Sequence, residues 1–278
     1  MVAWAHMQSR GYRVRVPKVR LDALLAQRGF FPSRTRAAAS VLAGEVLLGE
    51  GRSRADKPGT LVADDVKVEV AARDAYVSRG GRKLANALDA RELDVAGLRC
   101  LDVGASTGGF TDCLLQRGAE HVAALDVAYG ELDWSLRNDE RVTVIERRNA
   151  RELTVDLLPW RPDMITLDLA FISLSKVLPA VLACAPGRYD ALALVKPQFE
   201  VGRERVGKGG VVREVSDRRA ALLAAAVKAR HLGTSVLGFA PSGLPGPKGN
   251  RETFVHLAEA GREGELEDLE AAVGEVDA

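Results

Sequence analysis

The chain has 278 residues, of which 47% are hydrophobic and 28% are charged, and its formal net charge is +1. This balance fits a folded protein with one large domain, or with a medium domain and a small companion. It excludes a membrane-spanning protein, because no apolar run approaches the roughly 20 residues that a spanning helix needs. Residues 1–16 lack the apolar core of a secretory signal, so we expect a cytoplasmic protein that meets no membrane.

The N-terminal part of the chain is cationic. Residues 1–17 are predicted to form a flexible segment, and residues 1–36 carry eight Arg or Lys against one acid, Asp22. Such a cluster is typical of a surface that meets phosphates, and a solvated charged face explains it equally well. Both readings stay open at this point.

Residues 18–70 predict a compact α+β unit. Four apolar side chains fall on one face of a short helix that Gly29 ends: Val19, Leu21, Leu24 and Leu25. Ser33 is predicted to cap a second helix whose first turn carries Arg34 and Arg36. Cations at that end oppose the helix dipole, which makes more sense if an anion lies nearby. Short strands are expected in "EVLLG" and "TLVADDVKVEV".

Residues 71–82 are predicted to be a linker, because they mix charged and small residues with a glycine pair. Tyr76 is its aromatic anchor, and the two units are expected to reorient about it. A second unit then covers residues 83–262. Residues 261–278 carry seven acids against one base, so residues 263–278 are predicted to be an acidic tail.

The second unit alternates short apolar strands with helices, which predicts an α/β fold with a mostly parallel sheet that is buried on both faces. The final two strands look like a hairpin, which implies one antiparallel edge strand. Seven strands are expected, in this order: "LRCLDVGA", "HVAALDVA", "VTVIE", "DMITLDLAF", "ALALVKPQ", "TSVLGFAPS" and "ETFVHLAEA".

A glycine-rich loop follows the first of these strands, in "CLDVGASTGGFTDCLLQRGA", residues 100–119. It lacks the Gly-x-Gly-x-x-Gly of a dinucleotide site. Asp126 follows Asp102 by 24 residues, about where an acid binds ribose hydroxyls. Ribose together with a cationic group near Asp102 indicates S-adenosylmethionine, while capping or turn roles for both acids stay open. The predicted cofactor residues are Asp102, Gly104, Ser106, Thr107, Gly108, Gly109, Phe110, Asp126, Asn149 and Asp168.

Four charged residues stand at strand ends or loops of this unit: Lys83, Asp168, Lys196 and Glu252. A buried charge needs an opposite charge close by, so we expect all four to converge at one end of the sheet. Methyl transfer to a sugar hydroxyl needs such a set, because the hydroxyl attacks poorly until its proton is removed. We predict that Lys196 is the base, in the neutral form that burial and a neighbouring cation favour. Asp168 would orient it, and a purely structural ion-pair network is the alternative.

A basic, glycine-rich loop follows Lys196, in "EVGRERVGKGGVVRE", residues 200–214. It is predicted to bind an RNA backbone, with a solvated connection as the alternative. No metal site is predicted, since the three cysteines lack paired spacing. The predicted RNA-binding residues are Arg20, Arg34, Arg36, Arg79, Arg82, Arg203, Arg205 and Lys208.

These motifs resemble known families. "RLDALLAQRG", "SRTRAAASVLAGEVLL" and "KPGTLV" resemble the S4 RNA-binding domain, with "LLGEG" where that family has Val-Asn-Gly. The four charged residues resemble the Lys-Asp-Lys-Glu tetrad of FtsJ-type ribose 2′-O-methyltransferases. "SRGGRKL", "YGELDWSLRNDERV", "VKPQFEVGR" and "GPKGNRETF" are similar to the TlyA, or hemolysin A, family, with "RDAYV" where its linker has Arg-Ala-Trp-Val.

The resemblance implies a Rossmann-like, seven-stranded class I methyltransferase domain behind a small S4 domain. It also implies S-adenosylmethionine-dependent methylation of a cytidine ribose in 16S ribosomal RNA, 23S ribosomal RNA or both, with ribosomal RNA or ribosomal subunits as partners. Three other functions are alternatives to methyl transfer. A pseudouridine synthase needs a catalytic Asp in a mixed α+β domain, and a pore-forming hemolysin needs amphipathic insertion segments. A non-catalytic RNA-binding or assembly factor stays possible.

Overall fold

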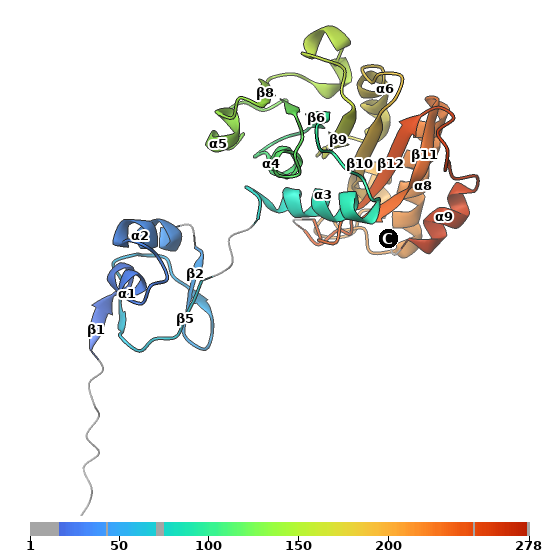
Figure 1. Cartoon of the computed structure of the whole chain (residues 1–278). Coiled ribbons are helices and arrows are strands. Elements are labelled where there is room, and N and C mark those ends of the chain that lie inside the picture. Colours follow the sequence, from blue (N-terminus) through green and yellow to red (C-terminus); the bar gives the residue numbers. More distant parts are fainter. Residues whose placement is uncertain (1–16, 43, 71–74, 247, 277–278) are drawn as a thin grey trace, which may run out of the picture. The chain divides into compact units, whose positions relative to one another are not determined.

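The chain divides into two compact units, Met1–Arg73 and Asp74–Ala278, which are described separately (Figure 1). The predicted flexible segment lies outside the described residues except for residue 17. Among the described residues, no helix combines the length and the apolar character that crossing a membrane requires. The structure is a computed structural model and describes residues 17–42, 44–70, 75–246 and 248–276.

The N-terminal unit is a small α+β fold. Strand β1 pairs antiparallel with β4, and β2 pairs antiparallel with both β3 and β5. Its apolar core joins the buried faces of the two helices, including Leu21 and Leu25 from α1 and Val41 from α2. The elements are α1 (Leu21–Gln27), α2 (Arg34–Leu42), β1 (Lys18–Arg20), β2 (Val46–Leu48), β3 (Ser53–Arg54), β4 (Leu61–Ala63) and β5 (Val68–Val70).

Local sequence explains the ends of these helices. Ser33 Oγ accepts a hydrogen bond from the backbone N–H of Arg36 at 3.2 Å, as an N-cap does. Val19 was predicted to lie in the first helix, and it lies in β1 instead, because its backbone pairs with Val62 of β4. The first helix therefore begins two residues later, at Leu21.

The C-terminal unit is built on a seven-stranded sheet, which confirms the predicted α/β fold. The strand order is β11-β12-β10-β9-β6-β7-β8. The strands are β6 (Arg99–Val103), β7 (His121–Leu125), β8 (Val142–Ile145), β9 (Met164–Leu167), β10 (Asp190–Val195), β11 (Thr234–Pro241) and β12 (Thr253–Glu259).

The final hairpin differs from the prediction. Strand β12 is antiparallel to both β10 and β11, and it lies between them rather than at the edge. The edge strand β11 therefore runs in the same direction as β10. Six of the seven residues of β12 are buried, whereas β11 alternates with partly exposed positions. The more apolar strand thus takes the interior place, since a fully buried strand gains the most from two neighbours.

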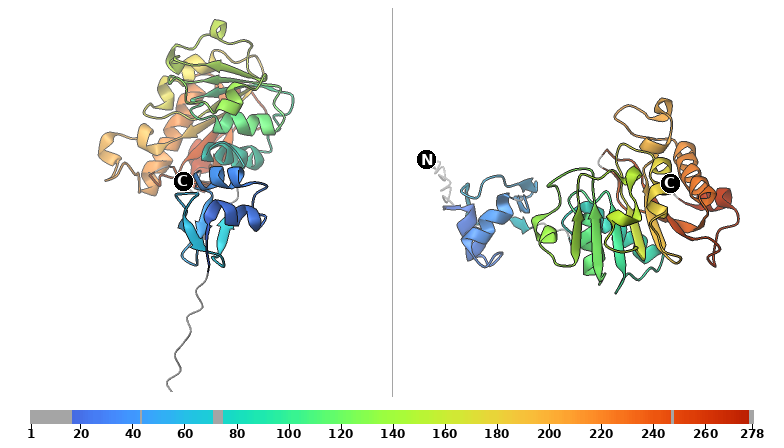
Figure 2. Two further views of the ribbon diagram at one scale, coloured as in Figure 1. Left: turned by 90° about the vertical axis from the view of Figure 1, so that its left-hand side faces the viewer. Right: turned by 90° about the horizontal axis from the view of Figure 1, so that it is seen from above.

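Helices cover both faces of this sheet (Figures 1 and 2). Helices α3 (Arg79–Ala90) and α4 (Gly109–Gln116) pack on one face. Helices α6 (Leu178–Leu182), α8 (Val215–His231) and α9 (Leu269–Glu275) pack on the other. Alternate residues of each strand feed the two cores, as Cys100 and Leu101 of β6 do. Two four-residue helices complete the unit, α5 (Trp134–Arg137) and α7 (Pro197–Glu200).

Two predicted boundaries differ from the structure. Helix α3 begins at Arg79, inside the predicted linker, and Tyr76 packs against the core beneath α3 and α4. Residues 71–74 of that linker lie outside the described residues. The predicted acidic tail contains α9, whose Leu269 and Val273 are buried against α8 and β11. Their spacing of four places both on one helical face, which the charge count concealed.

Candidate active site

Three strands carry a Leu-Asp pair near their carboxyl ends. The acids are Asp102 in β6, Asp126 directly after β7 and Asp168 directly after β9. The register places Asp102 inside the sheet, opposite Thr166. Asp126 and Asp168 both come one residue beyond the paired region, level with Gly104. Only these two acids therefore reach the carboxyl edge, where ligands of such sheets bind.

The glycine loop leaves β6 at this edge. Gly104 has a φ of +87°, and a Cβ there would lie 2.4 Å from the carbonyl oxygen of Asp168. Its N–H donates to the carbonyl of Leu125 at 2.8 Å. The loop is thus pressed between β7 and β9, and a residue with a side chain does not fit. Helix α4 begins just beyond it, at Gly109.

A first cavity of about 460 Å³ opens beside this loop. The carboxylate of Asp126 lines it and accepts hydrogen bonds from the backbone N–H groups of Ser106 and Ala128, each at 2.8 Å. Asn149 also lines it. Several other residues that line it were not among the predicted cofactor residues, including Val127, Glu131, Arg148, Leu169, Ile172 and Val177. These residues follow the carboxyl ends of β7, β8 and β9, and that position in the sequence could have identified them as candidate cofactor residues.

The first cavity fits an adenosyl group. Two backbone donors fix the Asp126 carboxylate, which keeps lone pairs for ribose hydroxyls. Apolar side chains, among them Leu169 and Ile172, offer a surface for a flat ring. These features are chemically suited to S-adenosylmethionine.

Asp102 is not part of this cavity. Its side chain is fully buried, and its carboxylate accepts hydrogen bonds from Thr111 Oγ1 at 2.7 Å and Thr166 Oγ1 at 3.2 Å. Burial raises the pKa of Asp102 to about 7, although the two hydroxyl donors oppose the shift. In this structure the Asp102 carboxylate is bonded within the fold and does not line the first cavity, and its role toward a cofactor stays a prediction. Its geometry is that of the alternative, an acid that holds the loop and α4 to the sheet.

Gly108 is likewise structural in its contacts. It has a φ of +96°, and a Cβ there would lie 2.3 Å from Leu136. It lines neither the first cavity nor a second cavity of about 520 Å³ on the other side of Gly104. Thr107, Gly109 and Phe110 line that second cavity, together with Ser106, which lines both.

The four charged residues come together around the second cavity. Lys83 of α3, Asp168 and Lys196 line it. Lys196 directly follows β10, and Glu252 precedes Thr253, which pairs with Val195, so Glu252 lies level with Lys196. Because β12 runs antiparallel to β10, its amino-terminal end, which Glu252 precedes, lies at the carboxyl edge of the sheet.

The four residues form two ion pairs. Lys196 Nζ lies 2.5 Å from Asp168 Oδ1, and Lys83 Nζ lies 2.5 Å from Glu252 Oε2. The side chains of Lys83 and Glu252 are 8% and 0% exposed, whereas those of Lys196 and Asp168 are 14% and 22% exposed. Lys83 and Glu252 are thus the inner, more buried pair, and Lys196 and Asp168 are the more exposed pair. Buried ion pairs of this kind add little stability on balance, which favours a chemical role.

The described end of the linker packs beside the glycine loop. The backbone N–H of Val77 donates to Asp112 Oδ2 at 2.7 Å, and Gln116 Nε2 donates to the carbonyl of Ala75 at 2.8 Å. A Cβ on Gly81 would lie 2.3 Å from Tyr76 and 2.7 Å from the carbonyl of Gly109. The chain that enters this unit therefore contacts α4 and the loop directly.

The predicted RNA-binding arginines of the N-terminal unit are partly engaged within the fold. Arg20 lies 2.7 Å and Arg34 lies 3.5 Å from the buried carboxylate of Asp22. The hydrogen bond from Arg20 lowers the pKa of Asp22 to about 2. Both side chains stay more than half exposed. Arg36 is exposed and makes no ion pair within the described residues.

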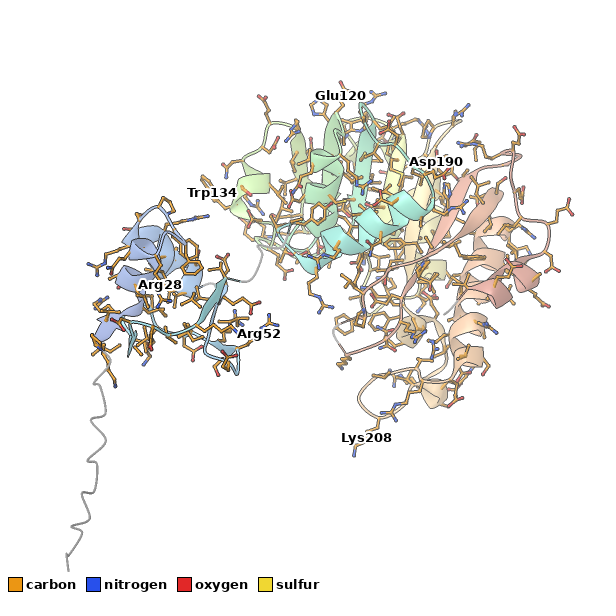
Figure 3. The ribbon with its side chains drawn as sticks, turned by 60° about the horizontal axis from the view of Figure 1, so that its bottom comes forward. Arg28, Arg52, Glu120, Trp134, Asp190 and Lys208 are labelled. Carbon is orange, nitrogen blue, oxygen red and sulfur yellow. The ribbon has the colours of Figure 1, made fainter. Side chains whose placement is uncertain are left out.

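The predicted RNA-binding residues of the C-terminal unit lie around the second cavity and on the basic loop. Arg79 lines the cavity and donates to the carbonyl of Pro245 at 2.8 Å, and Arg82 is also engaged within the fold. Arg205 lies 3.5 Å from Asp217. Arg203 is exposed, and Lys208 extends from the tip of the loop (Figure 3).

One exposed aromatic residue at the site was not among the predicted residues. Phe171 is 92% exposed, has a φ of +64° and lies 5.5 Å from the ring of Phe199. It lines the first cavity and also a third cavity that adjoins Lys196. Phe171 lies four residues beyond the end of β9. It closes the segment "ITLDLAF", which was expected to be a strand throughout, so nothing in the sequence indicates that its side chain is exposed.

Comparison with known proteins identifies the family. Residues 76–259 match the model of the FtsJ-like methyltransferases. The 16S/23S rRNA (cytidine-2′-O)-methyltransferase TlyA of Mycobacterium tuberculosis is 50% identical over 247 residues, which cover 86% of this chain and 90% of that protein. The candidate rRNA methyltransferase YqxC of Bacillus subtilis is 41% identical over 254 residues, covering 91% of this chain and 90% of that protein.

Solved structures agree with these relatives. A candidate hemolysin from Streptococcus thermophilus matches with a TM-score of 0.69 at 38% identity, covering 94% of this chain and 96% of that one. One from Lactococcus lactis matches with a TM-score of 0.67 at 41% identity, covering 72% of this chain and 97% of that one. The chain belongs to the FtsJ-like methyltransferase family, in the branch that contains the TlyA proteins.

Proposed function

We propose that this chain transfers a methyl group from S-adenosylmethionine to the 2′-hydroxyl of a cytidine ribose in ribosomal RNA. The observation that carries the proposal is the meeting of two ion pairs, Lys196 with Asp168 and Lys83 with Glu252, beside a cavity suited to an adenosyl group. The names of two relatives, which are cytidine-2′-O-methyltransferases of ribosomal RNA, support ribosomal RNA and cytidine as the substrate.

S-adenosylmethionine, when bound, supplies an electrophilic methyl group on a sulfonium. Asp126 is proposed to hold its ribose hydroxyls, because its carboxylate is fixed at the wall of the first cavity. The apolar residues of that wall would cover the adenine. Ser106, Thr107 and Gly109 line the second cavity, into which the rest of S-adenosylmethionine would extend.

Lys196 is proposed to take the proton of the attacking hydroxyl once its amine has released to solvent the proton that it holds in the ion pair with Asp168. Asp168 lies 2.5 Å away, so it fixes the direction of the amine and stabilises the ammonium that forms. Lys83 and Glu252 are less exposed and would hold the acceptor ribose in place rather than exchange protons with it. Holding the two reactants in line supplies much of the rate in such a transfer.

RNA binding is proposed to involve both units. The N-terminal unit presents Arg36 and the exposed parts of Arg20 and Arg34, which suits an S4-like contact with phosphates. In the C-terminal unit, Arg203 and Lys208 extend from the basic loop. The exposed ring of Phe171 offers a surface on which a base stacks.

The proposal is tested by Lys196→Ala. With a ribosomal RNA that the wild type methylates, we expect the single-turnover rate to fall at least about 100-fold, since general-base catalysis contributes roughly 10²–10⁴-fold. Cofactor affinity, measured by calorimetry, and RNA affinity should stay close to those of the wild type. Lys228→Ala, at an exposed position in α8, is the matched control. A Lys196→Ala variant that keeps a near-normal rate would refute the assignment of the base.

A further inference from the structure

The third cavity has no role in the scheme above. It measures about 300 Å³ and is lined by residues of the segments that follow β9 and β10 and by the loop before β12. It shares Ala170 and Lys196 with the second cavity and Phe171 with the first. A ligand in the third cavity therefore lies directly against the proposed base, Lys196.

The walls of the third cavity combine aromatic rings with cations. Phe171 and Phe199 meet at a ring separation of 5.5 Å and a tilt of 51°. Lys196 and Lys248 line the same space. Flat apolar surfaces next to positive charge suit a base and the phosphate of a neighbouring nucleotide.

Two amide side chains line this cavity, and they differ in their hydrogen bonds. Asn250 is buried, its Oδ1 accepts from the backbone N–H of Val212 at 2.9 Å, and its Nδ2 donates to the carbonyl of Gly210 at 2.8 Å. Asn250 thus fixes the base of the basic loop as one wall. One acceptor and one donor position of its amide are therefore used within the fold.

Gln198 lacks such partners. Its Oε1 is shielded from water and has no hydrogen-bond partner among the described residues, and its Nε2 makes no hydrogen bond with them either. A shielded polar atom without a partner destabilises a fold, so its presence calls for another explanation. The last torsion of Gln is soft, and a half-turn about it exchanges oxygen and nitrogen. The amide can therefore turn either atom toward the cavity.

We propose that the third cavity receives the base of the acceptor nucleotide and that Gln198 hydrogen-bonds its edge. This inference rests on the proposed function. The base of a nucleotide is attached to C1′, the carbon next to the one that carries the 2′-hydroxyl. Once that hydroxyl meets Lys196, the base must occupy space adjoining Lys196. The Gln198 amide can turn its donor toward the ring nitrogen N3 of cytosine or its acceptor toward the N4 amine.

The test compares wild type with Gln198→Met, which keeps the length of the side chain and removes the amide. The substrate is an RNA whose methylated position has been mapped with the wild-type protein. It is used with cytosine and with an abasic ribose at that position, under single-turnover conditions with excess enzyme. We expect Gln198→Met to react at least 10-fold more slowly on the cytosine substrate and as fast as wild type on the abasic one. Calorimetry should give an unchanged affinity for S-adenosylmethionine.

Stability separates this role from a structural one. Removal of a shielded amide without partners should leave the urea midpoint unchanged or raised, although activity falls. Gln27→Met, at an exposed position at the end of α1, is the control and should match wild type throughout. A lower midpoint, or an equal loss on both substrates, would overturn the contact with the base.

The failure of the two proposals can be told apart. If the wild type methylates no RNA, the proposed function fails and this inference fails with it. If the wild type methylates RNA and Gln198→Met does so equally well on the cytosine substrate, only the inference about Gln198 fails.

Discussion

The ends of strands β6 and β9 have nearly the same local sequence and opposite uses. Both contain an apolar run followed by Leu-Asp, yet Asp102 is fully buried whereas Asp168 faces the second cavity. The register explains the difference, since Asp168 stands two positions closer to the carboxyl edge than Asp102 does. The same dipeptide is thus a structural brace in one strand and part of the candidate active site in the other.

The comparison is tested most strongly by the same substitution at both acids. Asp168→Asn should lower the methylation rate at least about 100-fold, because Lys196 loses the charge that orients it. Unfolding in urea should change little, since Lys196 lines the second cavity and its ammonium can turn toward solvent there. Asp102→Asn should retain most of the activity at pH 6. The contrast fails if the two variants lose activity equally.

Truncation of the same two acids to Ala should affect stability in the opposite order, with the larger loss at Asp102. Asp102→Ala leaves the hydroxyls of Thr111 and Thr166 without their buried acceptor, so the free energy of unfolding should fall by about 1–3 kcal/mol. Asp168→Ala should cost clearly less. Urea denaturation followed by circular dichroism measures both. Equal losses would mean that burial does not distinguish the two sites.

Asp126 sharpens the comparison, because it reaches the same edge as Asp168 but lines the first cavity. Asp126→Asn should weaken the affinity for S-adenosylmethionine roughly 10-fold, which corresponds to about 1.4 kcal/mol. An amide supplies one acceptor where two backbone N–H groups and the ribose hydroxyls need several. Calorimetric titration is the measurement, with Asp168→Asn as the comparison. An unchanged affinity would remove Asp126 from the cofactor site.

A further effect concerns pH. The pKa of Asp102 is raised to about 7 in the folded state and has its ordinary value in the unfolded state. Between about pH 4 and 7, the folded state therefore binds a proton that the unfolded state has lost, so this group makes unfolding easier as pH rises. Asp102→Asn lacks that titration. The stability of wild type relative to Asp102→Asn should fall as pH rises through this window and level off above it.

Urea titrations of both proteins at pH 5, 6, 7 and 8 would measure this difference. All other carboxyl groups are present in both proteins, so their contributions to the pH dependence cancel in the difference. A difference that is independent of pH would show that Asp102 is already ionised at pH 5, and that the threonine hydroxyls stabilise its charge more than burial opposes it.

Sequence patterns predicted the α/β fold, the seven strands and the four charged residues, because hydrophobic periodicity and interrupted apolar runs are local signals. The use of each Leu-Asp pair was not predictable, because register depends on which residues of neighbouring strands pair. The same limit applies to β12, whose place between β10 and β11 is set by burial against both. Phe171 is exposed and has a positive φ, and its apolar neighbours in the sequence predict neither feature.

The place of β12 also has a consequence for biosynthesis. Lys83 is among the first residues of its unit to leave the ribosome, whereas its partner Glu252 is among the last. Strand β12 has neighbours on both sides, so the sheet stays split until residues 253–259 have been made. A nascent chain that already holds the glycine loop and Lys196 still lacks its inner ion pair. Closure of the sheet and of this ion pair is therefore delayed until translation of this domain is nearly finished.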